Sequence, residues 1–342
     1  MTLLTFVAMS ALMSDGAQFS HAGRLVAVVV THNRVAQLEV TLARLLDADP
    51  VHLEKVVVVD NASTDGTAAW LAEQQDPRLE VLRSETNVGG AGGFERGMRH
   101  AAEAHDPDWI VVMDDDARPE PAALAAFHGK TRSEAEGWAA AVYHPDGRIC
   151  DMNRPSRNPF WHPAILRRTL TGKGRDGFHI GPAEYGGDAP VGIDGTSFVG
   201  FFVSRAGIAR VGFPDGGLFI YGDDTLYTLG LTAAGGQILF DPAIRFEHDF
   251  TTQIDGDRRL RPMWKCYYHY RNLLMVYRLC SGPWFVLAGP AAALKWIAKV
   301  RHYPGERGLY LRVVGRAILD GLLGRRSLTF EQVREMAADR RP

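Results

Sequence analysis

The sequence predicts an α/β protein built on a mostly parallel β-sheet with helices on its faces. Short β-branched runs alternate with amphipathic helical patterns through the first third of the chain, and each run ends in a polar or glycine-rich loop. Strands that alternate with helices in this way form parallel sheets. With 342 residues, of which 46% are hydrophobic, the chain can bury a sizeable core.

Short, mainly apolar runs predict the first four strands. They are residues 25–31, 56–59, 79–82 and 109–113. Leucines at helical spacing follow the first run at Leu38, Leu42 and Leu45, and Trp70 begins a second helical pattern after the second run. A third helix is expected between the last two strands.

The loops after these strands are expected to line one crevice, because ligands of a doubly wound sheet bind beyond the carboxyl ends of its strands. The loops are residues 31–34, 60–65, 87–93 and 114–116.

Three adjacent carboxylates, Asp114, Asp115 and Asp116, follow the fourth predicted strand directly. Like charges this close raise one another's pKa unless a cation neutralises them. Mg²⁺ and Mn²⁺ take oxygen ligands and keep positions for substrate phosphates, so the triplet predicts a divalent metal and a nucleoside-diphosphate site. The alternative is a solvated acidic turn that caps a helix near Pro119, although one acid would suffice as a cap.

The glycine-rich loop at residues 89–93 lies between a predicted strand and a predicted helix. It does not meet the G-x-G-x-x-G fingerprint, because Glu95 stands where the third glycine is needed when counting starts at Gly90. Small residues still allow close backbone approach, and a helix amino terminus favours phosphate or ribose oxygens. A tight turn without a ligand is the alternative.

Residues 119–203 predict less regular elements. We expect a helix from Pro119 to about residue 136, a hairpin of residues 139–143 and 148–152, and a strand over residues 191–203. The intervening loop of residues 153–189 is long enough to be functional or mobile.

A second pair of carboxylates, Asp223 and Asp224, lies between an extended apolar run at residues 218–221 and a helix predicted over residues 225–234. One of the two is expected to cap that helix. Short extended segments then lead to His248. A lone histidine is a weak signal, and this one gains weight because an oxygen-rich metal site is already predicted.

The C-terminal region, residues 251–342, is predicted to be basic and helical. Residues 258–326 contain fourteen Lys or Arg and two acidic residues, whereas the whole chain has a formal net charge of -2. Such a block implies an anionic partner. The apolar run 284–298 is interrupted at Gly289-Pro290 and is shorter than the ~20 residues of a spanning helix. Its flanking Trp and basic residues favour interfacial contact with an anionic membrane over packing on the rest of the protein.

A helix over residues 264–280 places aromatic and cationic side chains on one face. They include Tyr267 and Arg271, which we expect to contact an acceptor. A nucleic-acid partner is not expected, because it would not explain an acidic cluster in a strand-end crevice.

The cysteines indicate the redox compartment of the protein. Cys150, Cys266 and Cys280 are odd in number and lack metal-binding spacing, which favours a reducing compartment without disulfides.

Residues 1–23 are interpreted as a disordered or surface-adsorbed leader, because the initial apolar run is short and has no basic residues.

Together these motifs resemble the inverting family-2 glycosyltransferases, which have the nucleotide-sugar-binding GT-A fold. The resemblance covers residues 25–250, and the matching segments are residues 28–34, 59–66, 87–94, 114–116 and 218–230. They are most similar to galactofuranosyltransferases and then to bacterial rhamnosyltransferases. Gly222 stands where related enzymes often have an aromatic residue, and the tail is shorter than in the large polymerising members, which argues against polymerisation.

The resemblance implies a catalytic domain at residues 24–250, with a nucleotide-sugar half at 24–130 and an acceptor half at 131–250. The implied metal ligands for Mn²⁺ or Mg²⁺ are Asp114, Asp116 and His248. The implied catalytic residues are Asp224, as general base, and Asp223. The implied donor-binding residues are Thr31, His32, Arg34, Asp60, Asn61, Ser63, Asp65, Asn87, Gly92, Gly93, Asp114 and Asp115.

The implied function is metal-dependent transfer of a sugar, with galactofuranose from UDP-galactofuranose favoured, to a lipid-linked or polysaccharide acceptor in cell-envelope synthesis. One alternative is a rhamnosyltransferase that uses dTDP-rhamnose. Another is a non-catalytic nucleotide-sugar-binding protein, which should have lost an acid or the histidine. We expect a cytoplasmic enzyme that associates peripherally with the inner face of the membrane.

Overall fold

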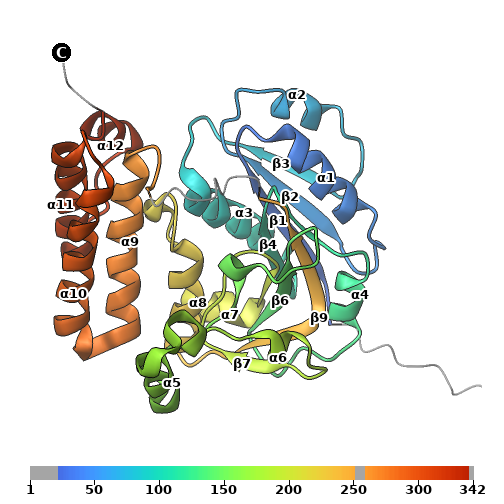
Figure 1. The fold of residues 1–342 in the computed structure, drawn as a ribbon. Helices are drawn as coiled ribbons and strands as arrows, with labels where there is room; N and C mark the ends of the chain where they lie inside the picture. Colours follow the sequence, from blue (N-terminus) through green and yellow to red (C-terminus); the bar gives the residue numbers. More distant parts are fainter. Residues whose placement is uncertain (1–21, 251–258, 339–342) are drawn as a thin grey trace, which may run out of the picture.

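The computed structural model describes residues 22–250 and 259–338 (Figure 1). An α/β layer carries the sheet, and a layer of C-terminal helices lies beside it. The predicted α/β architecture is therefore confirmed, whereas the leader expected over residues 1–23 lies almost entirely outside the described residues.

A mixed sheet of nine strands forms the centre of the described part of the chain. Its order is β3-β2-β1-β4-β8-β6-β9-β5, and β7 pairs with β9. Strands β1 to β4 pair in parallel as predicted, whereas β8 is antiparallel to both β4 and β6. The strands are β1 Leu25–Thr31, β2 Lys55–Asp60, β3 Leu79–Arg83, β4 Trp109–Asp114, β5 Ala117–Pro119, β6 Gly137–Tyr143, β7 Val191–Ile193, β8 Phe201–Ser204 and β9 Ile238–His248.

Helices cover both faces of this sheet and build the C-terminal layer. The helices are α1 Val35–Leu46, α2 Thr67–Ala72, α3 Gly89–His105, α4 Ala123–His128, α5 Pro163–Arg168, α6 Pro182–Tyr185, α7 Arg205–Val211, α8 Asp223–Ala233, α9 Trp264–Ser281, α10 Phe285–Ala298, α11 Arg307–Leu323 and α12 Phe330–Met336. Short 3-10 helices occur at Asp151–Asn153, Gly174–Gly177, Gly216–Leu218, Gly282–Trp284 and Lys299–His302, and a π-helical turn at Thr169–Lys173.

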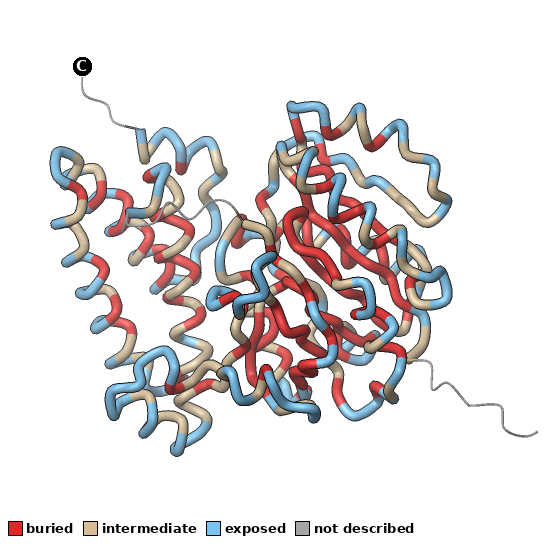
Figure 2. The backbone as a smooth tube through the Cα atoms, turned by 45° about the vertical axis from the view of Figure 1, so that its right-hand side comes forward, coloured by how far each residue is buried: buried red, intermediate tan, exposed pale blue. Residues whose placement is uncertain are grey.

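The central strands are buried on both faces of the sheet. Alternate residues of a strand point to opposite faces, and each face is covered by its own core cluster. Ala27 and Val29 of β1 belong to a core cluster that includes α1, whereas Val28 and Val30 belong to a second cluster with Phe94 of α3. Figure 2 shows the buried residues concentrated in these strands. The sheet is therefore a firm base for the loops at its carboxyl edge.

The helix expected to run from Pro119 to residue 136 is wrong in extent, since α4 ends at His128. Arg132 folds back on α4: its side chain is buried, donates to the Phe127 carbonyl at 2.7 Å and pairs with Asp241 at 2.8 Å. This contact with β9 turns the chain away from the helical path.

Two extended elements also differ from the prediction. The hairpin of residues 139–152 is reduced to a single bridge between Tyr143 and Ile149. The strand expected over residues 191–203 is divided into β7 and β8 by the irregular residues 194–200, the last of which, Gly200, has a φ of 68°.

The C-terminal helices have a core of their own, to which α9 to α12 and Phe219 contribute. Tyr267 and Arg271, predicted to share a face of α9, are both buried. Within residues 22–250 and 259–338, none of the helices combines the length and the apolar character needed to cross a bilayer.

Candidate active site

Two adjoining cavities open at the carboxyl ends of the central strands. The triplet cavity, of about 560 Å³, is lined by Asp114, Asp115 and Asp116, and the pair cavity, of about 480 Å³, is lined by Asp223 and Asp224. The residues that line both cavities are Gly90, Asp114, Met152, Ile220, Tyr221 and His248. Asp114 and His248, which are far apart in the sequence, therefore both lie where the two cavities meet.

Each acid of the triplet has a different environment. Asp114 ends β4 and lies opposite Val30 of β1. Asp115 accepts a hydrogen bond of 2.7 Å from the Thr31 hydroxyl. Arg34 lies 3.4 Å from Asp115 and forms a closer ion pair with Asp116. Thr31 and Arg34, predicted to bind a donor, thus also hold the triplet in place.

The triplet carries more negative charge than its neighbours balance. Burial, together with the charges of Asp116 and Asp115, raises the pKa of Asp114 well above its ordinary value. Burial also raises the pKa of Asp115 to about 6, although the Thr31 hydrogen bond and Arg34 oppose this. Burial opposes ionisation of Asp116 too, but His248 and Arg34 lower its pKa. A further cation beside Asp114 is therefore favoured.

His248 is fixed between Asp116 and Asn153. Its Nε2 lies 3.1 Å from Asp116 Oδ1, and its Nδ1 lies 2.7 Å from Asn153 Oδ1. Burial by itself would lower the pKa of His248, but the hydrogen bond to Asp116 and the charge of that carboxylate raise it to about 9. Because the Asn153 oxygen accepts at Nδ1, the other ring nitrogen faces the acids.

The donor set fits a divalent ion such as Mn²⁺ or Mg²⁺. Asp114 and Asp116 offer carboxylate oxygens, and His248 offers an imidazole nitrogen. Among the described residues the ligand atoms of these three side chains do not all lie within 4.8 Å of one another. Arg34 and His248 hold Asp116 in this arrangement, and His248 must release the proton at Nε2 before that nitrogen can bind a metal.

The loops that follow β1, β2 and β3 are tied to one another. Asn61 donates from Nδ2 to Asn87 Oδ1 at 3.1 Å and to the Gly89 carbonyl at 2.9 Å. Its own Oδ1 accepts from the Val88 amide at 2.9 Å, and its carbonyl accepts from His32 Nδ1 at 2.8 Å. His32, Asn61 and Asn87 all line the triplet cavity, as predicted for residues of one crevice.

Asp60, Ser63 and Asp65 lie behind this wall and are not among the residues that line the triplet cavity. Asp60 accepts from the Ser63 amide at 2.9 Å, and its buried Oδ2 has no hydrogen-bond partner among the described residues. Asp65 accepts from the Thr67 amide at 2.9 Å at the start of α2. Ser63 and Asp65 thus form hydrogen bonds within the chain that fix the loop between β2 and α2.

Gly92 and Gly93, predicted to meet a donor, are already inside α3, because this helix begins at Gly89. A Cβ added to Gly93 would lie 2.5 Å from Val30 Cγ1, so this glycine permits close packing of α3 on the sheet. The glycines that line the triplet cavity are Gly89 and Gly90.

Asp223 and Asp224 begin α8 and face the pair cavity. The expectation that one of them caps the helix is wrong, because Gly222 occupies the N-cap position with a φ of 79°. Asp224 Oδ1 accepts from the Thr225 amide at 2.6 Å. Burial raises the pKa of both acids and, with the charge of Asp224, brings that of Asp223 to about 7. A carboxylate with a raised pKa is a better proton acceptor.

The segment before α8, predicted to be extended, is instead a bent loop that α9 holds. Phe219 and Tyr221 both have positive φ values, 67° and 68°, which bulky residues rarely adopt. Asn272 donates from Nδ2 to the carbonyls of Leu218, Ile220 and Tyr221 at 3.0, 2.9 and 2.8 Å. Ile220 and Tyr221 line both cavities. The Asn272 side chain of α9 therefore helps to shape the site by holding the backbone of this loop.

Tyr267 and Arg271, predicted to contact an acceptor, are buried and line neither cavity. Tyr267 donates to Asp320 at 2.8 Å, and Arg271 donates to the Leu218 carbonyl at 2.9 Å. In this structure both side chains have packing roles, because their face of α9 is turned toward α11 and the loop instead of toward solvent.

Sequence reasoning missed Asn153, Asn272 and His269, which fix or line the site. Asn153 opens a segment that was interpreted only as a long loop, and no local pattern marks it. Asn272 gave a usable signal, because an amide on a buried helix face needs hydrogen-bond partners.

Residues 26–183 match the family model described as "Glycosyl transferase family 2". The chain is 33% identical over 208 residues to the galactofuranosyltransferase GlfT1 of Mycolicibacterium smegmatis, a match that covers 60% of this chain and 64% of that protein. It is 29% identical over 173 residues to the undecaprenyl-phosphate mannosyltransferase of Micrococcus luteus, covering 50% of this chain and 70% of the relative. The chain thus spans less than two thirds of the length of GlfT1.

The fold is similar to that of the mannosyltransferase PcManGT from Pyrobaculum calidifontis, solved in complex with GDP-Man and Mn²⁺. The TM-score is 0.52 at 16% identity, and the match covers 90% of this chain and 89% of that one. At this identity the likeness establishes a GT-A-like fold only. The ligands of this chain must be inferred from the residues of its own site.

We predict that Asn272→Leu destabilises the protein by about 1–3 kcal/mol, because buried carbonyls of the bent loop lose their donor. Chemical denaturation measures the loss, and hydrogen exchange should rise in residues 217–221. Tyr277→Phe, on the same helix, is the control and should change stability by less than about 0.5 kcal/mol. Equal effects of the two variants would contradict a specific role for Asn272.

Proposed function

We propose that this chain, whose residues 26–183 belong to glycosyltransferase family 2, is an inverting enzyme that transfers galactofuranose from UDP-galactofuranose. The observation that carries the proposal is the junction of the two cavities at Asp114 and His248. A nucleotide on one side and an acceptor on the other would meet there. The similarity to GlfT1 supports the choice of sugar.

The triplet cavity suits the nucleotide half of the donor. Its wall offers His32 and Asn61, whose positions are fixed by the interlocked loops, and the amino terminus of α3 at Gly89 and Gly90. A helix amino terminus favours phosphate oxygens. Buried Asp60 is a candidate partner for a ribose or base N–H or O–H, because its Oδ2 has no hydrogen-bond partner among the described residues and lies 3.8 Å from Arg83 Nε.

Asp114, Asp116 and His248 would hold the divalent ion. When bound, it would supply stabilisation of the negative charge that develops on the leaving diphosphate. Asp114 is favourably placed for such a cation, since burial and its acidic neighbours raise its pKa well above the ordinary value. Arg34 keeps Asp116 oriented and adds positive charge on the same side.

Asp224 would act as general base from the pair cavity. It accepts the proton of the acceptor hydroxyl as the new bond forms from that oxygen to the anomeric carbon, and the bond from that carbon to the diphosphate oxygen breaks. No covalent enzyme intermediate is needed, so the configuration inverts. The raised pKa of Asp224, caused by burial, makes it a stronger base than an exposed carboxylate.

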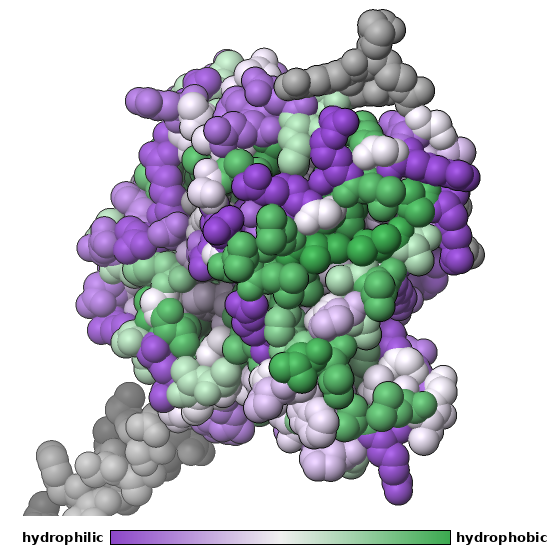
Figure 3. Space-filling view, turned by 90° about the vertical axis from the view of Figure 1, so that its left-hand side faces the viewer, coloured by the Kyte–Doolittle hydropathy of each residue, from purple (hydrophilic) through white to green (hydrophobic). Residues whose placement is uncertain are grey.

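A lipid-linked or glycan acceptor fits the apolar side of the pair cavity, where Phe198, Leu273 and Val276 form part of the lining. The exposed face of α10 and α11 would bring the enzyme to the inner surface of an anionic membrane. Val286 and Leu294 are 73% and 68% exposed, and Trp284 is 62% exposed. Figure 3 shows apolar side chains gathered on the face of the molecule that lies at the left of Figure 1.

We predict that UDP-galactofuranose protects the protein from thermal unfolding more than dTDP-rhamnose or UDP-hexopyranoses, and that protection requires Mn²⁺ or Mg²⁺. A chelator should abolish both protection and transfer, and Asp116→Ala should weaken the metal-dependent protection. Stronger protection by dTDP-rhamnose would point to a rhamnosyltransferase. Full transfer in chelator would overturn the role given to the metal.

Asp224→Asn should lower turnover by about 10²- to 10⁴-fold while donor binding is retained, because the amide cannot accept the proton. Single-turnover transfer and donor-dependent thermal protection separate these two effects. Asp223→Asn is the matched control on the preceding residue. If only Asp223→Asn lost turnover, the base would be Asp223.

Co-sedimentation with anionic vesicles should fall about tenfold or more for the variant Val286→Glu/Leu294→Glu, because each apolar side chain contributes about 1.5–3 kcal/mol when buried. Salt should weaken binding of the parent protein through screening of the basic residues. Leu170→Glu, at a position 75% exposed outside α10 and α11, is the control. Membrane association would be contradicted if vesicle binding did not depend on lipid charge or salt and were unchanged in the Val286→Glu/Leu294→Glu variant.

A further inference from the structure

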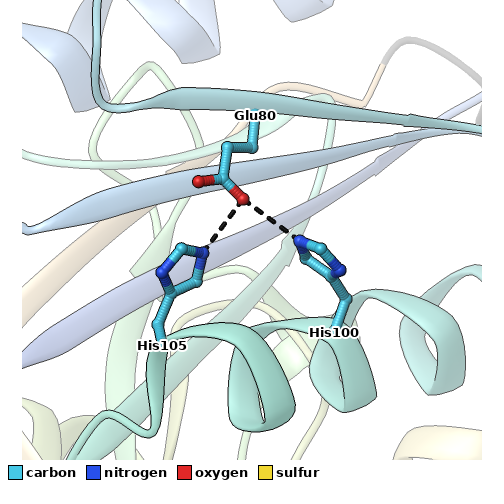
Figure 4. A group of neighbouring side chains, drawn as sticks. All are labelled: Glu80, His100 and His105. Atoms are coloured by element: carbon cyan, nitrogen blue, oxygen red, sulfur yellow. Dashed lines mark hydrogen bonds and ion pairs between the residues drawn. The ribbon is translucent and has the colours of Figure 1, made fainter.

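A cluster of two imidazoles and one carboxylate lies outside both cavities. Glu80 comes from β3, and His100 and His105 come from α3 (Figure 4). The Nε2 atoms of His100 and His105 lie 3.1 and 2.9 Å from the same oxygen, Glu80 Oε2. One potential ligand atom from each residue lies within 4.8 Å of the other two.

This arrangement has the composition of a transition-metal site. Two imidazoles and a carboxylate are ligands that Zn²⁺ binds, at distances of about 2.0–2.2 Å. Ligand atoms around one such ion are separated by roughly 3–3.5 Å, so the contacts at Glu80 are close to what an ion would require. Both histidines approach Glu80 through the same ring nitrogen, Nε2. The three side chains come from a strand and a helix of the folded domain, so the site is largely formed before an ion binds.

The surroundings of the cluster admit an ion. The side chains of Glu80, His100 and His105 are 30%, 35% and 13% exposed, which leaves access for the ion and for a water as fourth ligand. Lys55 lies 3.4 Å from the other carboxylate oxygen, Oε1, so it orients Glu80 without occupying the oxygen that faces the imidazoles. His105 is the last residue of α3, where the negative end of the helix dipole favours a cation.

The cluster is remote from the candidate active site. α3 begins at Gly89 on the triplet cavity and ends at His105, and its 17 residues span about 25 Å. The cluster residues line neither cavity. An ion bound there would join the edge strand β3 to the far end of the helix whose first residues form the cavity wall.

We propose that Glu80, His100 and His105 form a second metal site, selective for a borderline transition-metal ion such as Zn²⁺ and separate from the acidic site. Its nitrogen-rich ligands discriminate against Mg²⁺, which prefers oxygen ligands and keeps its waters. The ion takes the position between the Nε2 atoms and Glu80 Oε2, each neutral imidazole then carries its proton on Nδ1, and the ion clamps α3 to β3. This proposal is independent of the sugar and acceptor proposed above.

The test is calorimetric titration of the chelator-treated full chain with Zn²⁺ in the presence of saturating Mg²⁺, which occupies the acidic site. The expected result is one Zn²⁺ per chain, with a dissociation constant in the micromolar range or below and a raised unfolding temperature. His105→Gln and Glu80→Gln should weaken binding at least tenfold. Glu103→Gln, an exposed acid on the same helix, is the matched control and should bind like the parent.

Two further measurements keep the result decisive if a variant folds poorly. His100→Gln changes the most exposed ligand and should give the same loss. Co²⁺ bound to the parent protein should give the visible absorption of a low-coordinate nitrogen and oxygen site, which Zn²⁺ displaces. Asp116→Ala should retain this Zn²⁺ binding. Absence of Zn²⁺ binding in Mg²⁺, or binding unchanged by His105→Gln and His100→Gln, would overturn the proposal.

Discussion

The candidate active site depends on how the protein balances three consecutive carboxylates at the end of a buried strand. Thr31 ends β1, Arg34 comes from the loop after it, and His248 ends β9, so residues more than two hundred positions apart hold one acidic cluster. Asp114 remains the least compensated acid. Asp114 also lies where the two cavities meet, so a divalent ion beside it would face both of them.

The C-terminal helices complete this site without contributing the acids themselves. Asn272 and Arg271 of α9 bond to carbonyls in the loop that precedes α8, and they stabilise the unusual backbone of Phe219 and Tyr221. Phe219 also packs in the core of the C-terminal layer. The layer that carries the exposed apolar face is therefore packed directly against the loop that forms part of the cavity wall.

Where prediction failed, a distant contact or a glycine overrode the local pattern. The helix after Pro119 stops early because Arg132 reaches Asp241 of β9, a partner that no local window contains. The resemblance implies a donor-binding role for Gly92 and Gly93, which lie inside α3. In the structure Gly93 serves the need for close packing between a helix and a sheet.

The sequence by itself determined the parallel half of the sheet, the loops at its carboxyl edge and the acids they carry, because strand periodicity and strand-end placement are local properties. It also marked Asp224 and His248 as companions of the triplet through their resemblance to a known family. Only the tertiary structure decided which side chains share a wall. It brought Asn153 to His248, turned Tyr267 into the core and joined Glu80 to two histidines of α3, because such contacts depend on how distant elements pack.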